Sequence, residues 1–146
     1  DRMLEYVDLY CYCLIPNHFH LLVKTKPASK KDVDEIDYSK KFGNLFAAYA
    51  QSFNHYYHRK GSLFSQNFRR KQIESDDYLK TVVIYIHRNP VKHGLVENLT
   101  DWKHSSYQEY IYSMPRYCKN TEVIEWFSSK EIFKFCHTMD PDTDIE

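Results

Sequence analysis

Two apolar runs near the start of the chain predict a pair of strands. Residues 6–14 mix β-branched, aromatic and cysteine side chains without a helical period, and residues 18–25 form a second apolar run. Pro16 and Asn17 stand between the two runs, where they favour a turn. The pattern therefore predicts a hairpin of two antiparallel strands.

A longer segment then repeats apolar residues at spacings of three and four, which is the pattern of an amphipathic helix. This helix is expected to begin at Ser39 and to end before Gly61. Polar residues 26–37 before it predict a surface loop, and residues 68–73 after it predict a strand. We interpret three tyrosines as part of its apolar stripe, not as nucleophiles: Tyr49, Tyr56 and Tyr57.

The second half of the chain predicts two more helices. Ser75 is suited to an N-cap, with acidic residues at the next two positions, where the helix dipole favours them. This helix should end near Asn89, because the residue before Pro90 is pushed out of the α region. A last helix is expected over residues 121–137, and the acidic residues 140–146 are expected to be disordered.

The length and charge of the chain suggest one domain with two electrostatic regions. The 146 residues are enough for one core. With 20 basic and 20 acidic residues, composition alone predicts neither nucleic acid nor membrane as a partner. However, residues 58–93 hold eight basic and three acidic residues, whereas residues 122–146 hold two basic and seven acidic ones. This distribution favours one face that accepts an anion.

The cysteines and the hydropathy indicate a cytoplasmic protein. Four cysteines show no C-x-x-C pair, and Cys11 and Cys13 would point to the same side of a strand, so we expect reduced, mostly buried thiols. No run of 18 apolar residues and no signal-peptide pattern occurs. A membrane is therefore not an expected partner.

Two histidines on the second strand are the first candidates for chemistry. His18 and His20 flank Phe19, and alternate strand positions turn both imidazoles to one face. They could be a structural pair, or two nitrogen ligands of a divalent cation that still needs a third ligand. Tyr85 and Asn89 are four residues apart on the second helix, so they emerge from one face. A phenol is an oxygen nucleophile, and an amide oxygen can complete a metal site.

Four motifs in a fixed order give this pattern a family resemblance. "IPNHFHLL", "RKGSLFSQNFRRK", "YIHRNPVKHGLV" and "WKHSSY" resemble the single-tyrosine HUH transposases, most closely the REP-associated tyrosine transposases, over about residues 6–110. The resemblance implies an α+β, ferredoxin-like domain with an antiparallel sheet and packed helices over residues 1–114. A helical extension with an acidic tail would follow over residues 115–146. The family's first strand and helix are apparently lacking, so the chain is expected to be part of a longer product or to be completed by a partner.

The resemblance also implies roles for the candidate residues. His18, His20 and Asn89 would ligate Mg²⁺ or Mn²⁺, and Tyr85 would be the nucleophile. The implied function is binding of single-stranded, hairpin-bearing DNA, and its cleavage and rejoining through a 5′-phosphotyrosine. Basic side chains would follow the phosphates, and a phenylalanine would stack on a base. The ordinary alternatives are a solvated face for the charges and, more often than base stacking, a core position for the phenylalanines. These DNA-binding candidates are Arg69, Arg70, Lys71, Arg88, Lys92 and Phe68, with Phe64 as an alternative to Phe68.

Rival interpretations of the same residues remain open at the level of sequence. One is a DNA-hairpin-binding protein without catalysis. Another is a metallohydrolase or zinc module in which His87 or His93 supplies a third ligand. Tyr78, two turns before Tyr85, is the rival nucleophile. The expected location is the cytoplasm, in association with the nucleoid, and a second copy of the chain is a candidate partner.

Overall fold

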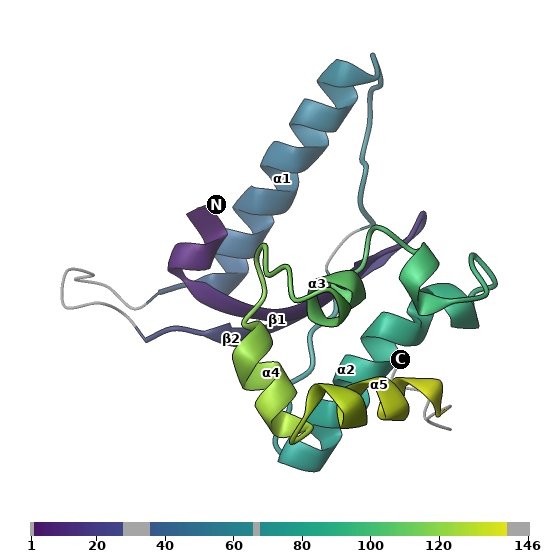
Figure 1. Ribbon diagram of the computed structural model, residues 1–146. Coiled ribbons are helices and arrows are strands. Elements are labelled where there is room, and N and C mark those ends of the chain that lie inside the picture. The colour runs from purple at the N-terminus through teal and green to yellow at the C-terminus, as the bar shows by residue number, and fades with distance from the viewer. Residues whose placement is uncertain (1, 28–35, 66–67, 140–146) are drawn as a thin grey trace. The chain divides into compact units, whose positions relative to one another are not determined.

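The computed structural model describes residues 2–27, 36–65 and 68–139, and its architecture is α+β (Figure 1). Its elements are η1 (Arg2–Glu5), β1 (Val7–Leu14), β2 (Phe19–Thr25), α1 (Tyr38–Tyr56), α2 (Asp76–Lys92), η2 (Leu99–Asp101), α3 (Tyr107–Ile111), α4 (Asn120–Trp126) and α5 (Lys130–Thr138). Two units can be distinguished. The first unit comprises Asp1–Val7 and Thr25–Gln72, and the second comprises Asp8–Lys24 and Ile73–Glu146. The division at residue 114 inferred from the sequence stays a prediction.

The predicted hairpin is confirmed by the pairing of β1 with β2. Cys11 and Cys13 are both fully buried on one side of β1, and all four cysteines are free thiols, as the sequence predicts. The other edge of β1 is covered by later segments of the second unit. The N–H of Leu14 donates to the carbonyl of His104 at 2.9 Å, and the N–H of Lys119 donates to the carbonyl of Leu9 at 2.9 Å. Both edges of β1 are therefore hydrogen-bonded.

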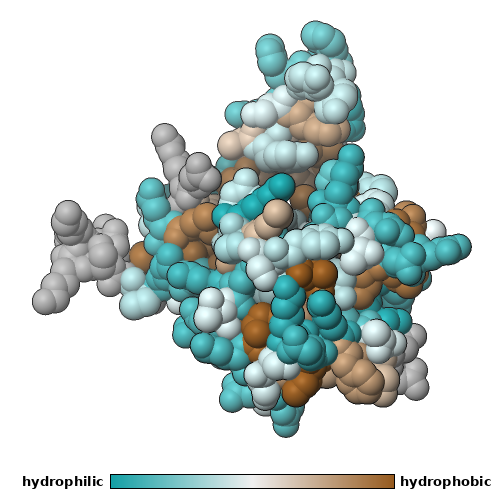
Figure 2. Space-filling model, in the orientation of Figure 1, coloured by the Kyte–Doolittle hydropathy of each residue, from teal (hydrophilic) through white to brown (hydrophobic). Residues whose placement is uncertain are grey.

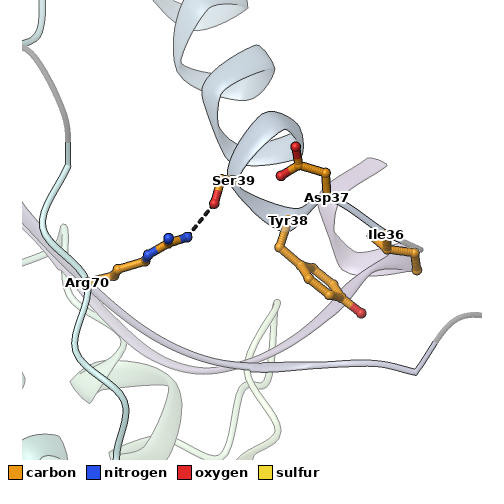
Figure 3. Close-up of a pocket in the computed structure, with 5 residues that line it drawn as sticks. All are labelled: Ile36, Asp37, Tyr38, Ser39 and Arg70. Carbon is orange, nitrogen blue, oxygen red and sulfur yellow. Dashed lines mark hydrogen bonds between the residues drawn. The ribbon is translucent and has the colours of Figure 1, made fainter. Parts of the chain in front are cut away.

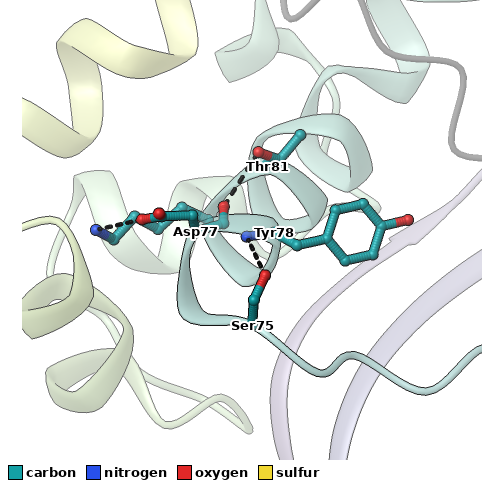
Figure 4. Close-up of polar contacts among 5 residues, drawn as sticks. Ser75, Asp77, Tyr78 and Thr81 are labelled. Carbon is teal, nitrogen blue, oxygen red and sulfur yellow. Dashed lines mark hydrogen bonds and ion pairs between the residues drawn. The ribbon is translucent and has the colours of Figure 1, made fainter.

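The start of α2 is confirmed and its end is not. The Ser75 hydroxyl accepts from the N–H of Tyr78 at 3.3 Å, and the Thr81 hydroxyl donates to the carbonyl of Asp77 at 3.2 Å (Figure 4). Asp77 lies in the first turn, where its charge complements the helix dipole. The helix then continues to Lys92, past the predicted end near Asn89.

Pro90 lies inside α2 because burial outweighs its local cost. The proline removes one N–H donor, so the carbonyl of Ile86 loses its usual helical partner. Asn89 and Pro90 are fully buried, which gives this turn a packing contribution that a solvated helix end lacks. The turn closes with the N–H of His93 donating to the carbonyl of Asn89 at 3.0 Å, and the N–H of Leu95 donating to that of Pro90 at 2.9 Å.

The core of the second unit gathers around Phe133 on α5. The rings of Tyr110 and Phe127 each lie 5.1 Å from the Phe133 ring, centroid to centroid. The single helix predicted over 121–137 is wrong, because α4 ends at Trp126 and α5 begins at Lys130. Ser128 adopts a positive φ of 67°, and the Ser129 hydroxyl caps α5 by accepting from Ile132. The break allows Phe127 and Phe133 to enter the same core.

The first unit is built around α1, and the predicted helix is confirmed there. Asp37 caps it by accepting from the N–H of Lys40 at 3.0 Å. The strand predicted over 68–73 is wrong, since that segment has no regular structure and no strand of the described residues pairs with it. The Phe68 ring packs instead 5.4 Å from the Phe46 ring on α1. A strand needs a hydrogen-bonded partner, which an apolar pattern alone cannot supply.

Two of the sequence expectations cannot be followed to their full extent. Most of the predicted 26–37 loop and the acidic residues 140–146 fall outside the described residues. Within the described ranges, the helices are too short or too polar to cross a lipid bilayer.

Candidate functional site

The candidate site lies within the second unit, where β2 and α2 meet. His18 directly precedes β2, and His20 is its second residue. The two rings are 5.0 Å apart and nearly perpendicular, with an interplanar angle of 86°. This is the arrangement expected when strand alternation directs both imidazoles to one face.

Helix α2 contributes two buried side chains one turn apart. Tyr85 is 5% exposed and Asn89 is fully buried. The side-chain nitrogen of Asn89 lies 3.1 Å from Nε2 of His20, and the Tyr85 ring centroid lies 5.4 Å from that of His20. The structure therefore brings together the four residues that the sequence singled out, across about 70 positions of chain.

Two polar atoms in this cluster are buried and have no hydrogen-bond partner among the residues that the structure describes, namely Nε2 of His18 and Oδ1 of Asn89. A buried acceptor without a partner costs about 1–3 kcal/mol, so native proteins rarely leave one without a purpose. A cation would satisfy both atoms, because each carries a lone pair. The side-chain nitrogen of Asn89 now faces Nε2 of His20. Turning the amide over by half a turn would exchange its two ends and place Oδ1 there instead.

The donor set fits a divalent cation that keeps open positions. Two imidazole nitrogens and one amide oxygen combine the ligand types of transition metals with an oxygen ligand that Mg²⁺ or Mn²⁺ accepts. In the described part of the chain, no group of three or more His, Cys, Asp or Glu is arranged for a metal ion. An Asn ligand is compatible with that result, whereas a zinc module of the usual His and Cys type finds no support.

Of the two histidines considered as a third zinc ligand, His87 makes its contacts elsewhere in the second unit, whereas His93 lies beside His18. Nδ1 of His87 lies 2.9 Å from Nε2 of His137, and Nε2 of His87 lies 2.8 Å from the Ser106 hydroxyl. Burial lowers the pKa of His87 well below its usual value, and it lowers that of His137 to about 4. Both are neutral at physiological pH, so this pair joins α2 to α5 through a contact between uncharged rings. The His93 ring, in contrast, lies 5.1 Å from that of His18.

Positive charge reaches the site from the end of α2. Lys92 is exposed, and its ammonium lies 5.3 Å from the centroid of the Tyr85 ring. Arg88 makes a contact within the fold. Its guanidinium donates to the carbonyl of His137 at 2.8 Å and thereby connects α2 to α5. The structure thus gives Arg88 a structural contact that the sequence did not reveal.

The remaining DNA-binding candidates belong to the first unit. Phe68, Arg69, Arg70 and Lys71 are exposed. The Arg70 guanidinium donates to the Ser39 hydroxyl and lines an open hollow of about 370 Å³ at the start of α1 (Figure 3). The other lining residues are Ile36, Asp37 and Tyr38. Because Asp37 also faces this hollow, we assign no anion to it.

Tyr78 and Tyr85 occupy different levels of α2. Tyr78 lies in the first turn, and seven residues of helix place Tyr85 about 10 Å further along the axis. It is Tyr85 whose ring packs against His20. This position favours Tyr85 over its rival.

Sequence reasoning missed one residue of the site. Asn17 was interpreted only as part of the turn, but its Oδ1 lies 2.9 Å from Nδ1 of His18. The available signal in the sequence was its place directly before the H-x-H motif. In the structure it contacts Nδ1 of His18 and not the buried Nε2.

Comparison with known proteins gives a partial match to a curated protein. The chain is 32% identical over 98 residues to a Haemophilus influenzae protein named "Putative REP-associated tyrosine transposase". The match covers 65% of this chain and 56% of the relative, so the chain spans little more than half of that protein's length. No family model matches the chain, and no solved structure matches it. The similarity therefore suggests a transposase-like protein.

Proposed function

We propose that the chain is a transposase-like DNA strand transferase that cleaves and rejoins single-stranded DNA through a covalent bond to Tyr85. The observation that carries the proposal is the cluster in the second unit. Tyr85 and Asn89 lie against His20, and Nε2 of His18 and Oδ1 of Asn89 are buried polar atoms without a hydrogen-bond partner in the described part of the chain. The relative's name points to the same class of chemistry.

The residues of the cluster have separate tasks in this proposal. His18, His20 and Asn89 would hold Mg²⁺ or Mn²⁺. When bound, the cation supplies Lewis-acid polarisation of a non-bridging phosphate oxygen. Tyr85 would supply the attacking oxygen, and the ammonium of Lys92, 5.3 Å from the centroid of its ring, would add positive charge to the site where the phosphate reacts.

The reaction balances without an external energy source. The bond between the Tyr85 oxygen and phosphorus forms as the bond from phosphorus to the 3′ oxygen breaks. The phenol loses its proton, and the departing oxygen takes one up as a free 3′-hydroxyl. A second 3′-hydroxyl can then attack the phosphotyrosine, which restores a DNA strand and the phenol.

The first unit supports DNA as the substrate class. Residues 38–72 contain seven Lys and Arg residues and no Asp or Glu. Exposed aromatic side chains accompany these charges, among them Tyr56 at 75% and Phe68 at 40% exposed. Figure 2 shows hydrophobic residues open to solvent beside hydrophilic ones along α1. Basic groups for phosphates, combined with rings for bases, are the composition of a single-strand-binding surface.

Labelled DNA tests the proposal directly. A pool of hairpin-bearing single-stranded oligonucleotides is incubated with the protein and Mn²⁺, then separated on a denaturing gel. Label at the 3′ end should migrate with the protein, and label at the 5′ end should be released with a free 3′-hydroxyl. Tyr85→Phe should abolish the adduct and keep DNA binding, whereas the matched variant Tyr78→Phe should keep both. An adduct that survives Tyr85→Phe would disprove the assignment.

The burial of Tyr85 favours one second candidate function. At 5% exposure its ring is closed off from a large substrate. A protein that binds hairpin DNA without cutting it would tolerate this burial. DNA retention by the wild-type chain, with no adduct at any Mn²⁺ concentration, would select this alternative.

A further inference from the structure

The two ring nitrogens of His18 have opposite surroundings. Nδ1 lies 2.9 Å from Oδ1 of Asn17, at the exposed side of the ring. Nε2 is buried and has no hydrogen-bond partner within the described ranges. Among the described residues, Asn17 is therefore the polar partner of this imidazole, and the contact is made at Nδ1.

This contact determines the tautomer. With the side-chain oxygen of Asn17 facing it, as in this structure, Nδ1 of His18 carries the hydrogen, because that oxygen can only accept. A neutral imidazole has one N–H group, so Nε2 is then left with a buried lone pair that has no partner among the described residues. The opposite tautomer would bury an N–H donor that has no acceptor, which is a costly arrangement.

We propose that Asn17 is a positioning residue that holds His18 as the Nδ1–H tautomer, so that Nε2 is available to a divalent cation. The inference rests on the proposed function for the identity of the ligand, although the tautomer itself does not depend on it. Metal-binding histidines usually donate their second N–H to a neighbouring oxygen, which fixes the ring orientation and raises the basicity of the ligating nitrogen. Asn17 would supply that oxygen here.

The tautomer can be measured without metal or DNA. Long-range ¹H–¹⁵N correlation spectra of ¹⁵N-histidine-labelled protein, at a pH where imidazoles are neutral, distinguish Nδ1–H from Nε2–H. His18 is assigned by the loss of its signals in His18→Gln. Wild type and Asn17→Asp, which keeps an acceptor oxygen, should show Nδ1–H. Asn17→Leu should shift His18 to Nε2–H or to a mixture. An Nε2–H tautomer in wild type, or an unchanged spectrum in Asn17→Leu, would overturn the proposal.

Metal affinity gives a second readout that a merely structural turn residue would not move. Mn²⁺ binding, followed by the loss of the free-ion electron paramagnetic resonance signal, should weaken about 10- to 100-fold in Asn17→Leu. Asn17→Asp should retain the affinity. The matched control is Asn44→Leu, at an exposed asparagine of α1. Equal Mn²⁺ affinity in Asn17→Leu and Asn44→Leu would contradict a role for Asn17.

The inference and the proposed function can fail separately. A Tyr85 adduct that forms normally in Asn17→Leu, together with an unchanged tautomer, would disprove the positioning role of Asn17. The proposed strand-transfer function would stand. If the His18 tautomer changes in Asn17→Leu but the wild-type protein forms no adduct, the positioning role of Asn17 is supported and the catalytic proposal is disproved.

Discussion

Helices α1 and α2 have the same kind of sequence pattern and opposite surroundings. Both carry apolar residues at spacings of three and four. Helix α2 has 17 residues, and seven of them are buried: Val82, Val83, Tyr85, Ile86, His87, Asn89 and Pro90. Helix α1 has 19 residues, and none is buried. Periodicity therefore predicts that a helix forms and which face is apolar, but not what covers that face.

Under the proposed function, the contrast separates two kinds of surface. Burial of α2 fixes Tyr85 and Asn89 against His20, as a site that positions reacting groups requires. The aromatic side chains of α1 are open, and Tyr49 and Tyr57 are more than half exposed. An exposed aromatic stripe in a segment without acidic residues suits contact with a flexible polyanion.

The largest effect on stability should come from the buried face of α2. Ile86→Ala should lower the free energy of unfolding by about 2–5 kcal/mol, because Ile86 is 3% exposed and its removal leaves a cavity. Leu45→Ala on α1, at 42% exposed, is the matched control and should cost much less. Urea unfolding followed by circular dichroism measures both. Equal losses would mean that α1 is covered in solution as α2 is.

The buried histidine pair should make the second unit sensitive to acid. The pKa values of His87 and His137 are lowered by burial, so the unfolded chain takes up protons first as the pH falls. Stability should be constant above about pH 6.5 and decrease below it, by up to about 1.4 kcal/mol per pH unit for each histidine.

Unfolding at a series of pH values tests this sign. The expected slope below pH 6.5 should shrink in the double variant His87→Leu, His137→Leu, which has no imidazole to protonate there. A wild-type stability that rises on acidification through this window would contradict the burial of a neutral pair.

Removing the contact between α5 and α2 should lower stability by an intermediate amount. Arg88→Gln removes the charged donor to the carbonyl of His137 and should lower stability by about 1.5 kcal/mol. Lys92→Gln, at the exposed end of the same helix, should change stability by less. Hydrogen exchange of the α5 amides should accelerate in Arg88→Gln alone. If both variants behave alike, the guanidinium contact does not hold α5.

The smallest effect on stability should come from the open face of α1. Tyr56→Ala should change the free energy of unfolding by less than about 0.5 kcal/mol, because the side chain is 75% exposed. Its single-stranded DNA affinity should nevertheless fall at least about fivefold if the ring stacks on a base. Tyr112→Ala, at 57% exposed in the second unit, is the matched control for both measurements. Unchanged DNA affinity in Tyr56→Ala would show that the exposed face of α1 does not bind DNA through this ring.

Local signals in the sequence account for the elements that were predicted well. The Pro16–Asn17 turn, the Ser75 cap and the spacing of α1 act over a few residues, so they can be recognised directly. The pairing of His20 with Asn89 was anticipated from motif order, although nothing local shows that positions 69 apart meet.

The missed features depend on partners distant in sequence. Pro90 stays helical because its turn is buried, and α4 and α5 separate because two phenylalanines enter one core. The contact of His87 with His137 joins positions 50 apart, and no spacing rule predicts it. Asn17 was missed for another reason, since its residue type suits a turn equally well.

Peptide mass spectrometry of the trapped adduct tests the central claim most directly. Trypsin cuts after Lys80 and Arg88, so the peptide TVVIYIHR contains Tyr85 and no other tyrosine, and Tyr78 falls in the preceding peptide. After incubation with hairpin-bearing single-stranded DNA and Mn²⁺, followed by nuclease digestion, the nucleotide mass should appear on TVVIYIHR. A nucleotide on the Tyr78 peptide, or DNA cleavage with no nucleotide on any tyrosine, would contradict the account.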